Sequence, residues 1–300
     1  YIYHKTMAVA PMEEIDVRHM LRDKNPRIAA MMPPAALRGL ELVAHQRELR
    51  AFIREAAGCH GCEFVERALK RLHITVALEG EENLPPSPRF VMCANHPTGG
   101  IDGLVLMHLL CRRYGGVRVP ANDLLTGLSG LSELLVPINK YGSNRDRVVS
   151  LTEAYAVPLP VLVFPAGRTA RLRGGVVFRG ALREYPWNKA FLKLARRSHR
   201  TIVPVGISGR NSARFYAIWK MRRVFGVNLN LEMLLLMDEL MRQRGSTRRV
   251  VIAPPIEPEA VPGDVVGAQQ IRYVVERLAV SANGAAGRDR LREKERVACP

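Results

Sequence analysis

VMCANHPTGGIDGLVL, residues 91–106, is the segment from which the architecture of this 300-residue chain can be inferred. An apolar run ends at Asn95, Pro97 disfavours a helical conformation for His96, and a second apolar run follows Asp102. The two intervening glycines allow a tight bend, so we expect a strand, a turn and a helix in direct succession, with Asp102 at the N-cap. This succession is typical of an α/β fold.

The sequence around this segment repeats the pattern. From His73 onward, short β-rich runs alternate with runs of helical periodicity. We expect helices at 103–113, 122–134, 146–156, 188–198, 212–224 and 231–242, and one more before the end of the α/β region. The expected strands are ITVAL, RFVMCA, VRVP, LVPIN, VLVFP, TIVPVGI and RVVIAPP.

The N-terminal part has a different pattern. Residues 34–56 predict one amphipathic helix with arginines between its apolar positions, and EFVERALKRL predicts a second. We therefore expect a helical N-terminal subdomain at 1–72, an α/β domain at 73–283 and a charged tail at 284–300. The apolar face of the first helix can pack on the main domain or contact a membrane.

The charge of the chain is strongly positive. Lys and Arg outnumber Asp and Glu by 45 to 28, a formal net charge of +17, which attracts a polyanion, an anionic membrane surface or an acidic protein. The arginines are spread along the chain, and nothing resembles the known RNA-sheet or zinc-finger signatures, so nucleic acid is not the expected partner.

No apolar run reaches the roughly 20 residues of a spanning helix. The first residues show no secretory signal, and a chain beginning at Tyr1 is expected to be a partial one.

The five cysteines, at 59, 62, 93, 111 and 298, form no recognisable disulfide framework and indicate a reducing compartment. The CHGC segment at 59–62 has redox or half-zinc spacing, but no second Cys pair or His cluster completes a metal site. We expect helix-junction cysteines and no metal.

His96 and Asp102 are the first candidates for chemistry. A bend at the glycines can bring the two side chains within hydrogen-bond reach, and an Asp that accepts one imidazole N–H leaves the other nitrogen free to take a proton. The alternative is a turn histidine beside a helix cap. No nucleophile accompanies the pair, because TGLSGLS and GISGR lack the last glycine of a Gly-x-Ser-x-Gly elbow.

Two further loops at strand ends carry basic residues. VPINK places Lys140 just past one strand, and VFPAGRTAR places Gly167, Arg168, Thr169 and Arg171 just past another. Sheets of this class commonly bind ligands at such ends, and arginines suit a phosphate or carboxylate. Each segment alone is also compatible with a solvated basic turn.

Taken together and in this order, these pieces resemble the four blocks of the glycerolipid acyltransferase superfamily. The blocks are Asn95, His96 and Asp102; 136–140; FPAGRTAR at 164–171; and IVPVGI at 202–207. NHPTGGIDGL and VPVGISGRNSARFY look most similar to the hemolysin-like branch, which includes lyso-ornithine lipid acyltransferases. Three departures from the superfamily pattern are five residues between His96 and Asp102, Ala166 for the usual Glu, and Lys140 for the usual Arg.

The resemblance implies a mixed sheet flanked by helices and an O-acyltransferase of lipid metabolism. A fatty acyl group would pass from an acyl carrier protein or coenzyme A thioester to a hydroxyl of a lysolipid, such as a lyso-ornithine lipid or lysophosphatidic acid. His96 would be the general base and Asp102 its orienter, without a cofactor or metal. Backbone N–H groups of Thr98, Gly99 and Gly100 are candidate oxyanion donors. The other expected substrate-binding residues are Asn95, Lys140, Gly167, Arg168, Thr169 and Arg171.

The positive charge then indicates a place for the protein. We expect a cytoplasmic, bacterial protein, peripheral on the inner face of the cytoplasmic membrane, where a basic surface suits anionic lipid and an acidic carrier protein. Two alternatives stay open: a non-catalytic anionic-lipid or polyanion-binding protein on the same scaffold, and an amine acceptor that gives N-acyl products.

Overall fold

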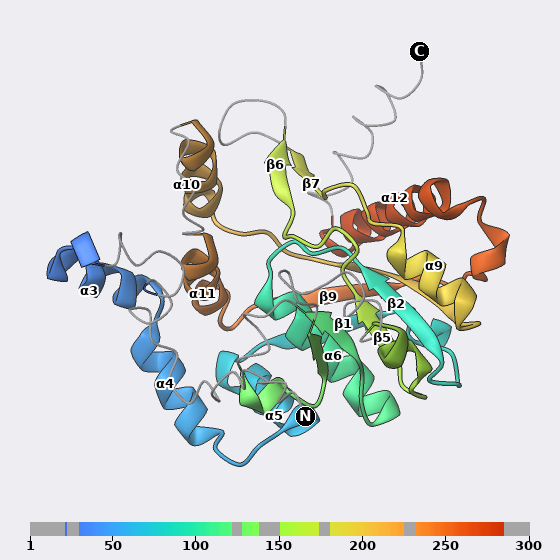
Figure 1. Ribbon diagram of the computed structural model, residues 1–300, viewed down its shortest axis with the longest axis horizontal. Helices are drawn as coiled ribbons and strands as arrows, with labels where there is room; N and C mark the ends of the chain where they lie inside the picture. Colours follow the sequence, from blue (N-terminus) through green and yellow to red (C-terminus); the bar gives the residue numbers. More distant parts are fainter. Residues whose placement is uncertain are drawn as a thin grey trace, which may run out of the picture.

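A five-stranded mixed sheet forms the centre of the computed structural model, which describes residue 22 and residues 30–121, 128–137, 151–173, 181–224 and 232–284. The strand order is β1-β9-β8-β2-β5, with β9 antiparallel to β8 and the other neighbours parallel (Figure 1). The bounds are β1 Thr75–Glu79, β2 Phe90–Ala94, β5 Val161–Val163, β8 Thr201–Ile207 and β9 Thr247–Ile252. The predicted fold class, a mixed sheet flanked by helices, is confirmed.

Strand β2 shows why this sheet is covered on both faces. All five of its residues are buried, and their side chains alternate between two cores. Phe90, Met92 and Ala94 belong to the core shared with α5 (Gly61–Leu72) and α6 (Gly100–Tyr114), whereas Val91 and Cys93 belong to the core shared with α9 (Ala190–Arg197) and α12 (Asp264–Ala282). A continuous apolar run was therefore the signal of a central strand.

Two pairs of short strands extend this arrangement. β3 (Val119–Ala121) pairs in parallel with β4 (Leu135–Pro137), and a parallel bridge between Arg118 and Val161 places this pair beside β5. β6 (Arg171–Arg173) and β7 (Ala181–Arg183) form a separate antiparallel pair outside the central sheet (Figure 1). The sequence did not predict this second pair, because strands of three residues are too short to show an alternating pattern.

The amphipathic segment 34–56 is two helices rather than the predicted one. α3 (Pro34–Val43) ends at Ala44, and α4 (Gln46–Glu55) begins after His45, whose φ of 47° is left-handed. A left-handed residue breaks the helical hydrogen-bond ladder, while the apolar periodicity continues across the break. α10 (Ala213–Val224) and α11 (Glu232–Arg242) lie beside α3 on the same side of the molecule (Figure 1).

Most predicted elements that fall on described residues hold within a few residues, and residues 146–150 of the helix expected at 146–156 lie outside them. α6 begins at Gly100 rather than 103, and the helix expected at 122–134 is, in its described part, a 3₁₀ turn at Ser129–Leu131 followed by β4. The remaining 3₁₀ turns are Glu81–Asn83 and Pro258–Ala260. The domain division at residues 72 and 283 stays a prediction, and the expected tail beyond Gly284 lies outside the described residues.

The cysteine pattern needs a correction. Cys62 of α5 and Cys111 of α6 form a disulfide, with their Cα atoms 5.6 Å apart, whereas Cys59 and Cys93 are free thiols. The odd, scattered spacing gave no reason to pair them; the packing of α5 against α6 does. Across the described helices, none is long and apolar enough to cross a bilayer.

Candidate active site

The candidate residues gather at one edge of the sheet, where β2, β5 and β8 end. The loop after β2 carries His96, the loop after β5 carries residues 164–170, and the loop after β8 begins at Ser208. These three strands are parallel neighbours, so their carboxyl ends meet at the same edge. The predicted meeting of the first and third sequence blocks is therefore observed: the backbone N–H of Ala170 donates to the carbonyl of His96 at 2.8 Å.

Asp102 is completely buried, and its carboxylate accepts three hydrogen bonds from its own loop. Oδ2 accepts the backbone N–H groups of Thr98, at 2.8 Å, and Gly99, at 2.9 Å, while the hydroxyl of Thr98 donates to Oδ1. Gly99 is the N-cap of α6, so Asp102 is the third helical residue rather than the predicted N-cap. Its side chain closes the first turn as the acidic half of a capping box does.

This arrangement corrects the predicted oxyanion hole. The N–H groups of Thr98 and Gly99 point at Asp102 and are not available to a developing oxyanion. Of the three predicted donors, only the Gly100 N–H is not given to Asp102 among the hydrogen bonds of the described residues. The donors instead solvate a buried carboxylate, which would otherwise be costly to bury.

The ring of His96 faces the same carboxylate. Nδ1 lies 3.1 Å from Oδ2 of Asp102, so the five-residue gap does let the two side chains meet. The distance is that of a hydrogen bond, but the alignment is not, and among the described residues Nδ1 has no other partner. Catalytic hydrogen bonds are often misaligned before substrate binds. The ring stacks on Phe164 with centroids 4.2 Å apart, and the side chain is 20% exposed, which leaves Nε2 as the nitrogen that faces away from Asp102.

Glu184, which the sequence did not single out, is the second buried carboxyl group at His96. It follows β7, is 6% exposed, and accepts the backbone N–H of His96 at 2.7 Å through Oε1. The indole N–H of Trp187 donates to Oε2 at 3.0 Å. Burial raises the pKa of Glu184 to about 7, although both hydrogen bonds oppose the rise. The only sequence signal was a Glu three residues before a Trp.

Asn95 connects two strand ends. Its Nδ2 donates to the carbonyl of Ile207 at 2.9 Å, and its Oδ1 accepts the N–H of Ile207 at 2.8 Å. Both ends of the amide are thus used to hold the exit of β2 against the exit of β8, and the side chain is 6% exposed. The structure places Asn95 behind the site as a connection between strands.

The third-block residues divide into an exposed and a buried set. Gly167 and Arg168 are exposed, and the Arg168 guanidinium lies 5.7 Å from the ring centroid of Tyr185. Thr169 and Arg171 are buried; the Arg171 guanidinium donates to the carbonyl of Thr169 at 2.8 Å and to its hydroxyl, and it lies over the ring of Phe215. Arg168 is therefore the arginine of this loop that is presented to solvent.

Arg248 of β9 is another residue that the sequence did not indicate. It is buried and donates to the carbonyl of Ser208 at 3.3 Å and to the side chain of Gln243, while its Nε finds no hydrogen-bond partner within the described part of the chain. Burial lowers its pKa, and the charge of Asp102 acts in the opposite direction. The buried guanidinium of Arg248 and the buried carboxylate of Asp102 therefore interact electrostatically. Lys140, the predicted second-block residue, lies outside the described residues.

Helix α11 borders the loop after β2. A Cβ placed on Gly99 would lie 3.1 Å from Leu236 and 3.4 Å from Thr169, and one on Gly100 would lie 3.1 Å from Leu240. Gly99 also has a φ of 99°, which L side chains rarely adopt. The paired glycines therefore let α11 and the third-block loop approach the backbone directly.

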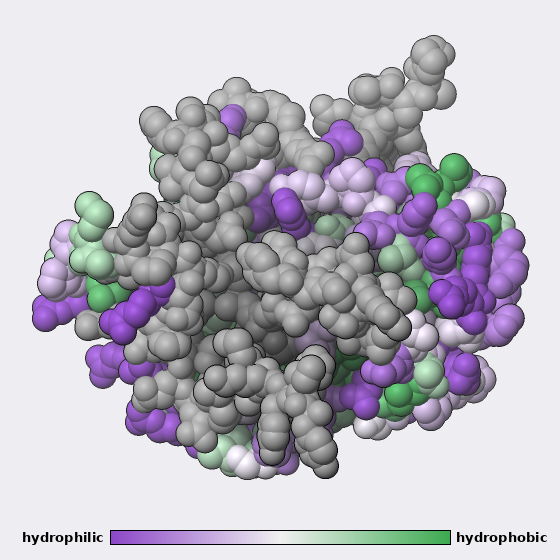
Figure 2. Space-filling model, viewed as in Figure 1, coloured by the Kyte–Doolittle hydropathy of each residue, from purple (hydrophilic) through white to green (hydrophobic). Residues whose placement is uncertain are grey.

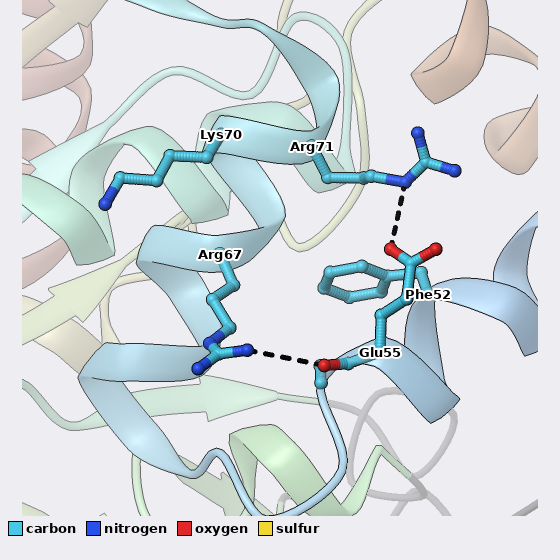
Figure 3. Close-up of a pocket in the computed structure, with 6 residues that line it drawn as sticks. Phe52, Glu55, Arg67, Lys70 and Arg71 are labelled. Atoms are coloured by element: carbon cyan, nitrogen blue, oxygen red, sulfur yellow. Dashed lines mark hydrogen bonds and ion pairs between the residues drawn. The ribbon is translucent and has the colours of Figure 1, made fainter.

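A pocket elsewhere does not belong to this site. It has a volume of about 410 Å³ and lies between α4 and α5 (Figure 3). Arg71 and Arg67, on its α5 wall, interact with the side chain and the carbonyl of Glu55, and Lys70 pairs with Glu66. Its cations are thus matched by local acceptors. In the part of the chain that the structure describes, no three His, Cys, Asp or Glu side chains group to hold a metal ion.

Comparison with known proteins identifies relatives. A family model described as "Acyltransferase" matches residues 19–283. A lyso-glycine lipid O-acyltransferase of Phocaeicola vulgatus is 33% identical over 87% of this chain and 92% of its own, and one of Bacteroides thetaiotaomicron is 34% identical over 87% and 94%. Among solved structures, the 1-acyl-sn-glycerophosphate acyltransferase of Thermotoga maritima is similar at 17% identity, with a TM-score of 0.45 over 82% of this chain and 81% of that chain.

Proposed function

The chain belongs to the acyltransferase family whose model covers residues 19–283, and from that premise we propose that it moves a fatty acyl group from a thioester to a hydroxyl of a lysolipid. The resemblance to glycerolipid acyltransferases noted from the sequence is thereby confirmed. The acceptor we propose is a lysolipid whose head group carries an amino acid, because both relatives are named lyso-glycine lipid O-acyltransferases. A lyso-ornithine lipid and lysophosphatidic acid are the other acceptors to test.

One observation carries the proposal: His96 Nδ1 lies 3.1 Å from a carboxylate that is completely buried. A carboxylate at Nδ1 holds the tautomer in which Nε2 lacks a proton, and it stabilises the imidazolium that forms when Nε2 takes one. Three loop donors keep Asp102 in place while it does so. Capping the helix and orienting the histidine are thus two uses of one side chain.

We propose direct transfer without a covalent enzyme intermediate. Nε2 of His96 takes the proton of the acceptor hydroxyl as its oxygen attacks the thioester carbonyl carbon. The carbon–sulfur bond then breaks, and the proton leaves with the sulfur as a thiol. Positioned base catalysis supplies roughly 100- to 10,000-fold, and holding the two substrates together supplies the rest.

The exposed third-block residues are the proposed contacts for the acceptor head group. Arg168 reaches solvent at the same edge of the sheet as His96, and a guanidinium can bind a carboxylate or phosphate through two hydrogen bonds. Gly167 and Thr169 place it, and Lys140 is proposed to contribute a second cation. The donor is proposed to be an acyl carrier protein or coenzyme A thioester, with no further cofactor.

A peripheral place on the cytoplasmic face of the membrane is part of the proposal. On α3 and just before it, Met31 is 83% exposed and Leu42 is 73% exposed. Figure 2 shows apolar residues beside strongly hydrophilic ones at the edge of the molecule formed by α3. Exposed apolar side chains on a chain with a formal net charge of +17 favour binding to anionic bilayers, so vesicle sedimentation should increase with anionic lipid content and decrease with salt.

The test of the proposal is an acyl-transfer assay with the purified protein. Palmitoyl-carrier protein and palmitoyl-coenzyme A are offered with lyso-glycine lipid, lyso-ornithine lipid and lysophosphatidic acid, and products are identified by mass spectrometry and by release of the acyl group in mild alkali. His96→Ala should abolish transfer while vesicle binding persists. Near-normal transfer by His96→Ala would overturn the mechanism, and vesicle binding without transfer in the native protein would favour a non-catalytic lipid-binding role. Alkali-stable products would indicate an amine acceptor.

A further inference from the structure

We propose that Glu184 is a positioning residue for His96 and that Trp187 holds Glu184 in place for this purpose. The inference rests on the proposed function, since it concerns the base of that reaction. Neither residue belongs to the sequence blocks from which the site was first inferred. Both lie in the segment REYPWN at 183–188, which links β7 to α9.

Glu184 contacts the backbone of His96, and the backbone fixes where the imidazole ring is attached. Oε1 of Glu184 accepts the N–H of His96 at 2.7 Å, and the carbonyl of His96 accepts the N–H of Ala170 at 2.8 Å. The peptide groups on both sides of the His96 Cα are therefore held by different segments. The ring is held from a third direction by Phe164. The backbone and one ring face of His96 are thus held by three segments, and Nδ1 lies 3.1 Å from Oδ2 of Asp102.

The other oxygen of Glu184 is anchored to the helical layer of the fold. Oε2 accepts the indole N–H of Trp187 at 3.0 Å. Trp187 is itself fixed: its ring packs edge-on against Phe191 of α9, and its carbonyl accepts the side-chain amide of Gln269 in α12 at 3.0 Å. A continuous series of contacts thus runs from α12 through Trp187 and Glu184 to the backbone of the base.

Glu184 and Trp187 are both buried, so their hydrogen bonds are shielded from water. Glu184 is 6% exposed and Trp187 is 4% exposed, so no bulk water can replace either hydrogen bond. In its ionised form, above a pKa of about 7, Glu184 suits the position because it accepts at both oxygens, one hydrogen bond from His96 and one from Trp187. An amide cannot satisfy both donors, since one of its ends also donates. The chemistry of the position thus selects Glu over Gln.

Three variants test the inference. Glu184→Gln sets an NH₂ group against one of the two N–H donors and should lower kcat by roughly 10- to 100-fold, because small displacements of a catalytic group have effects of this size. KM for the lysolipid should change less than threefold, because the two hydrogen bonds of Glu184 are not to residues proposed to bind the acceptor head group. Trp187→Phe removes only the indole donor and should lower kcat by roughly two- to fivefold. In the double variant the amide NH₂ faces the Phe ring and its oxygen accepts the His96 N–H, so kcat should recover at least threefold over Glu184→Gln.

A matched control separates this role from simple loss of a buried hydrogen-bonded carboxylate. Glu239 is 1% exposed and accepts both the N–H and the hydroxyl of Ser212, so Glu239→Gln carries the same kind of substitution at a carboxylate whose described hydrogen bonds do not include His96. It should lower the melting temperature as Glu184→Gln does, with little change in kcat. Recovery in the double variant, together with an active Glu239→Gln, supports the proposal. Native kcat in Glu184→Gln, or a double variant no better than the single, overturns it.

The same assay tests the role of His96 and the role of Glu184 separately. If His96→Ala is inactive and Glu184→Gln is fully active, the proposed function stands and the inference about Glu184 fails. If His96→Ala keeps native activity, the proposed mechanism fails, and the inference about Glu184 fails with it. If the native protein transfers no acyl group, the proposed function itself fails.

Discussion

The loop after β2 and the link between β7 and α9 each bring a buried carboxyl group to His96, but they do so in opposite ways. Asp102 lies six positions after His96, faces its ring, and receives all its hydrogen bonds from its own loop. Glu184 lies 88 positions away, holds the backbone of His96, and receives its second hydrogen bond from Trp187. One carboxyl group is set by local chain geometry and the other by the packing of α9 and α12.

The two groups also differ in electrostatics. Burial raises the pKa of Glu184 to about 7, and the nearby charge of Asp102 adds to the rise. Asp102 has three donors where Glu184 has two. The proposed base is thus oriented by a side chain that is visible in the local sequence and positioned by one that is not.

Removing the charge of Asp102 tests the first half of the comparison. Asp102→Asn can keep an oxygen at the Oδ2 position, and the Thr98 hydroxyl can rotate to accept from the new NH₂ group. We therefore expect a folded protein whose kcat is lower by roughly 100- to 10,000-fold, because the imidazolium loses its stabilising anion. Steady-state kinetics and thermal unfolding measure the two effects separately.

Asp264 offers a matched control for that substitution, since it is an Asp in the first turn of α12. Asp264→Asn should leave kcat at the native value. If Asp102→Asn keeps more than a tenth of native activity, Asp102 serves as a helix cap alone.

The pH dependence of stability tests the second half. Because the pKa of Glu184 is raised from 4.5 to about 7, the folded state holds a proton that the unfolded state has lost between these values. Its contribution to stability is thus complete below pH 4.5 and decreases as pH rises to about 7, by about 3 kcal/mol in the free energy of unfolding. Among the described residues, the titratable groups that act on Glu184 include His96 and Asp102.

Denaturant unfolding at a series of pH values, with Glu184→Gln as reference, measures this contribution. The native protein should lose stability relative to the variant between pH 4.5 and 7. Parallel curves for the two proteins over that range would show that Glu184 titrates at its ordinary value.

The same contrast explains how much could be predicted from the sequence. The central strand, the bend and the meeting of His96 with Asp102 were predictable, because an apolar run, two glycines and a short spacing constrain them locally. Glu184 and Arg248 were not, because they reach the site from β7 and β9 through pairings that no local pattern encodes. The Cys62–Cys111 disulfide was missed because it depends on the packing of α5 against α6, and the break at His45 was missed because the apolar periodicity continues across it.

The roles predicted for residues within the sequence blocks also depended on where their N–H groups and side chains point, which the sequence does not show. The loop N–H groups were in the expected place, but Thr98 and Gly99 donate to Asp102 instead of facing a substrate. In the third block, two arginines three positions apart have opposite environments, with Arg168 exposed and Arg171 buried under Phe215. Residue type was predictable at these positions; the hydrogen-bond partner was not.

Gly99 tests whether the local geometry of the first loop is as strict as the comparison requires. Gly99→Ala forces a Cβ onto a φ of 99° and within 3.1 Å of Leu236, so we expect a loss of about 1–3 kcal/mol in the free energy of unfolding. Gly39→Ala is the control, because its Cβ would meet nothing within 4 Å in the middle of α3, and it should be neutral or stabilise by about 0.5–1 kcal/mol. Equal stabilities for the two variants would mean that the loop tolerates another backbone path.

Arg168 provides the smallest expected effect, because it belongs to neither carboxyl group's network. Its side chain is exposed at the site edge of the sheet, so Arg168→Ala should change the free energy of unfolding by less than about 0.5 kcal/mol. If it holds the acceptor head group, KM for an anionic lysolipid should rise roughly three- to tenfold, the loss of one charged hydrogen bond, while kcat stays within twofold. The control is Arg113→Ala, an exposed arginine at the opposite end of α6 from His96, which should change neither parameter. A fall in kcat without a change in KM would instead place Arg168 among the groups that act on His96, and would extend the comparison from two side chains to three.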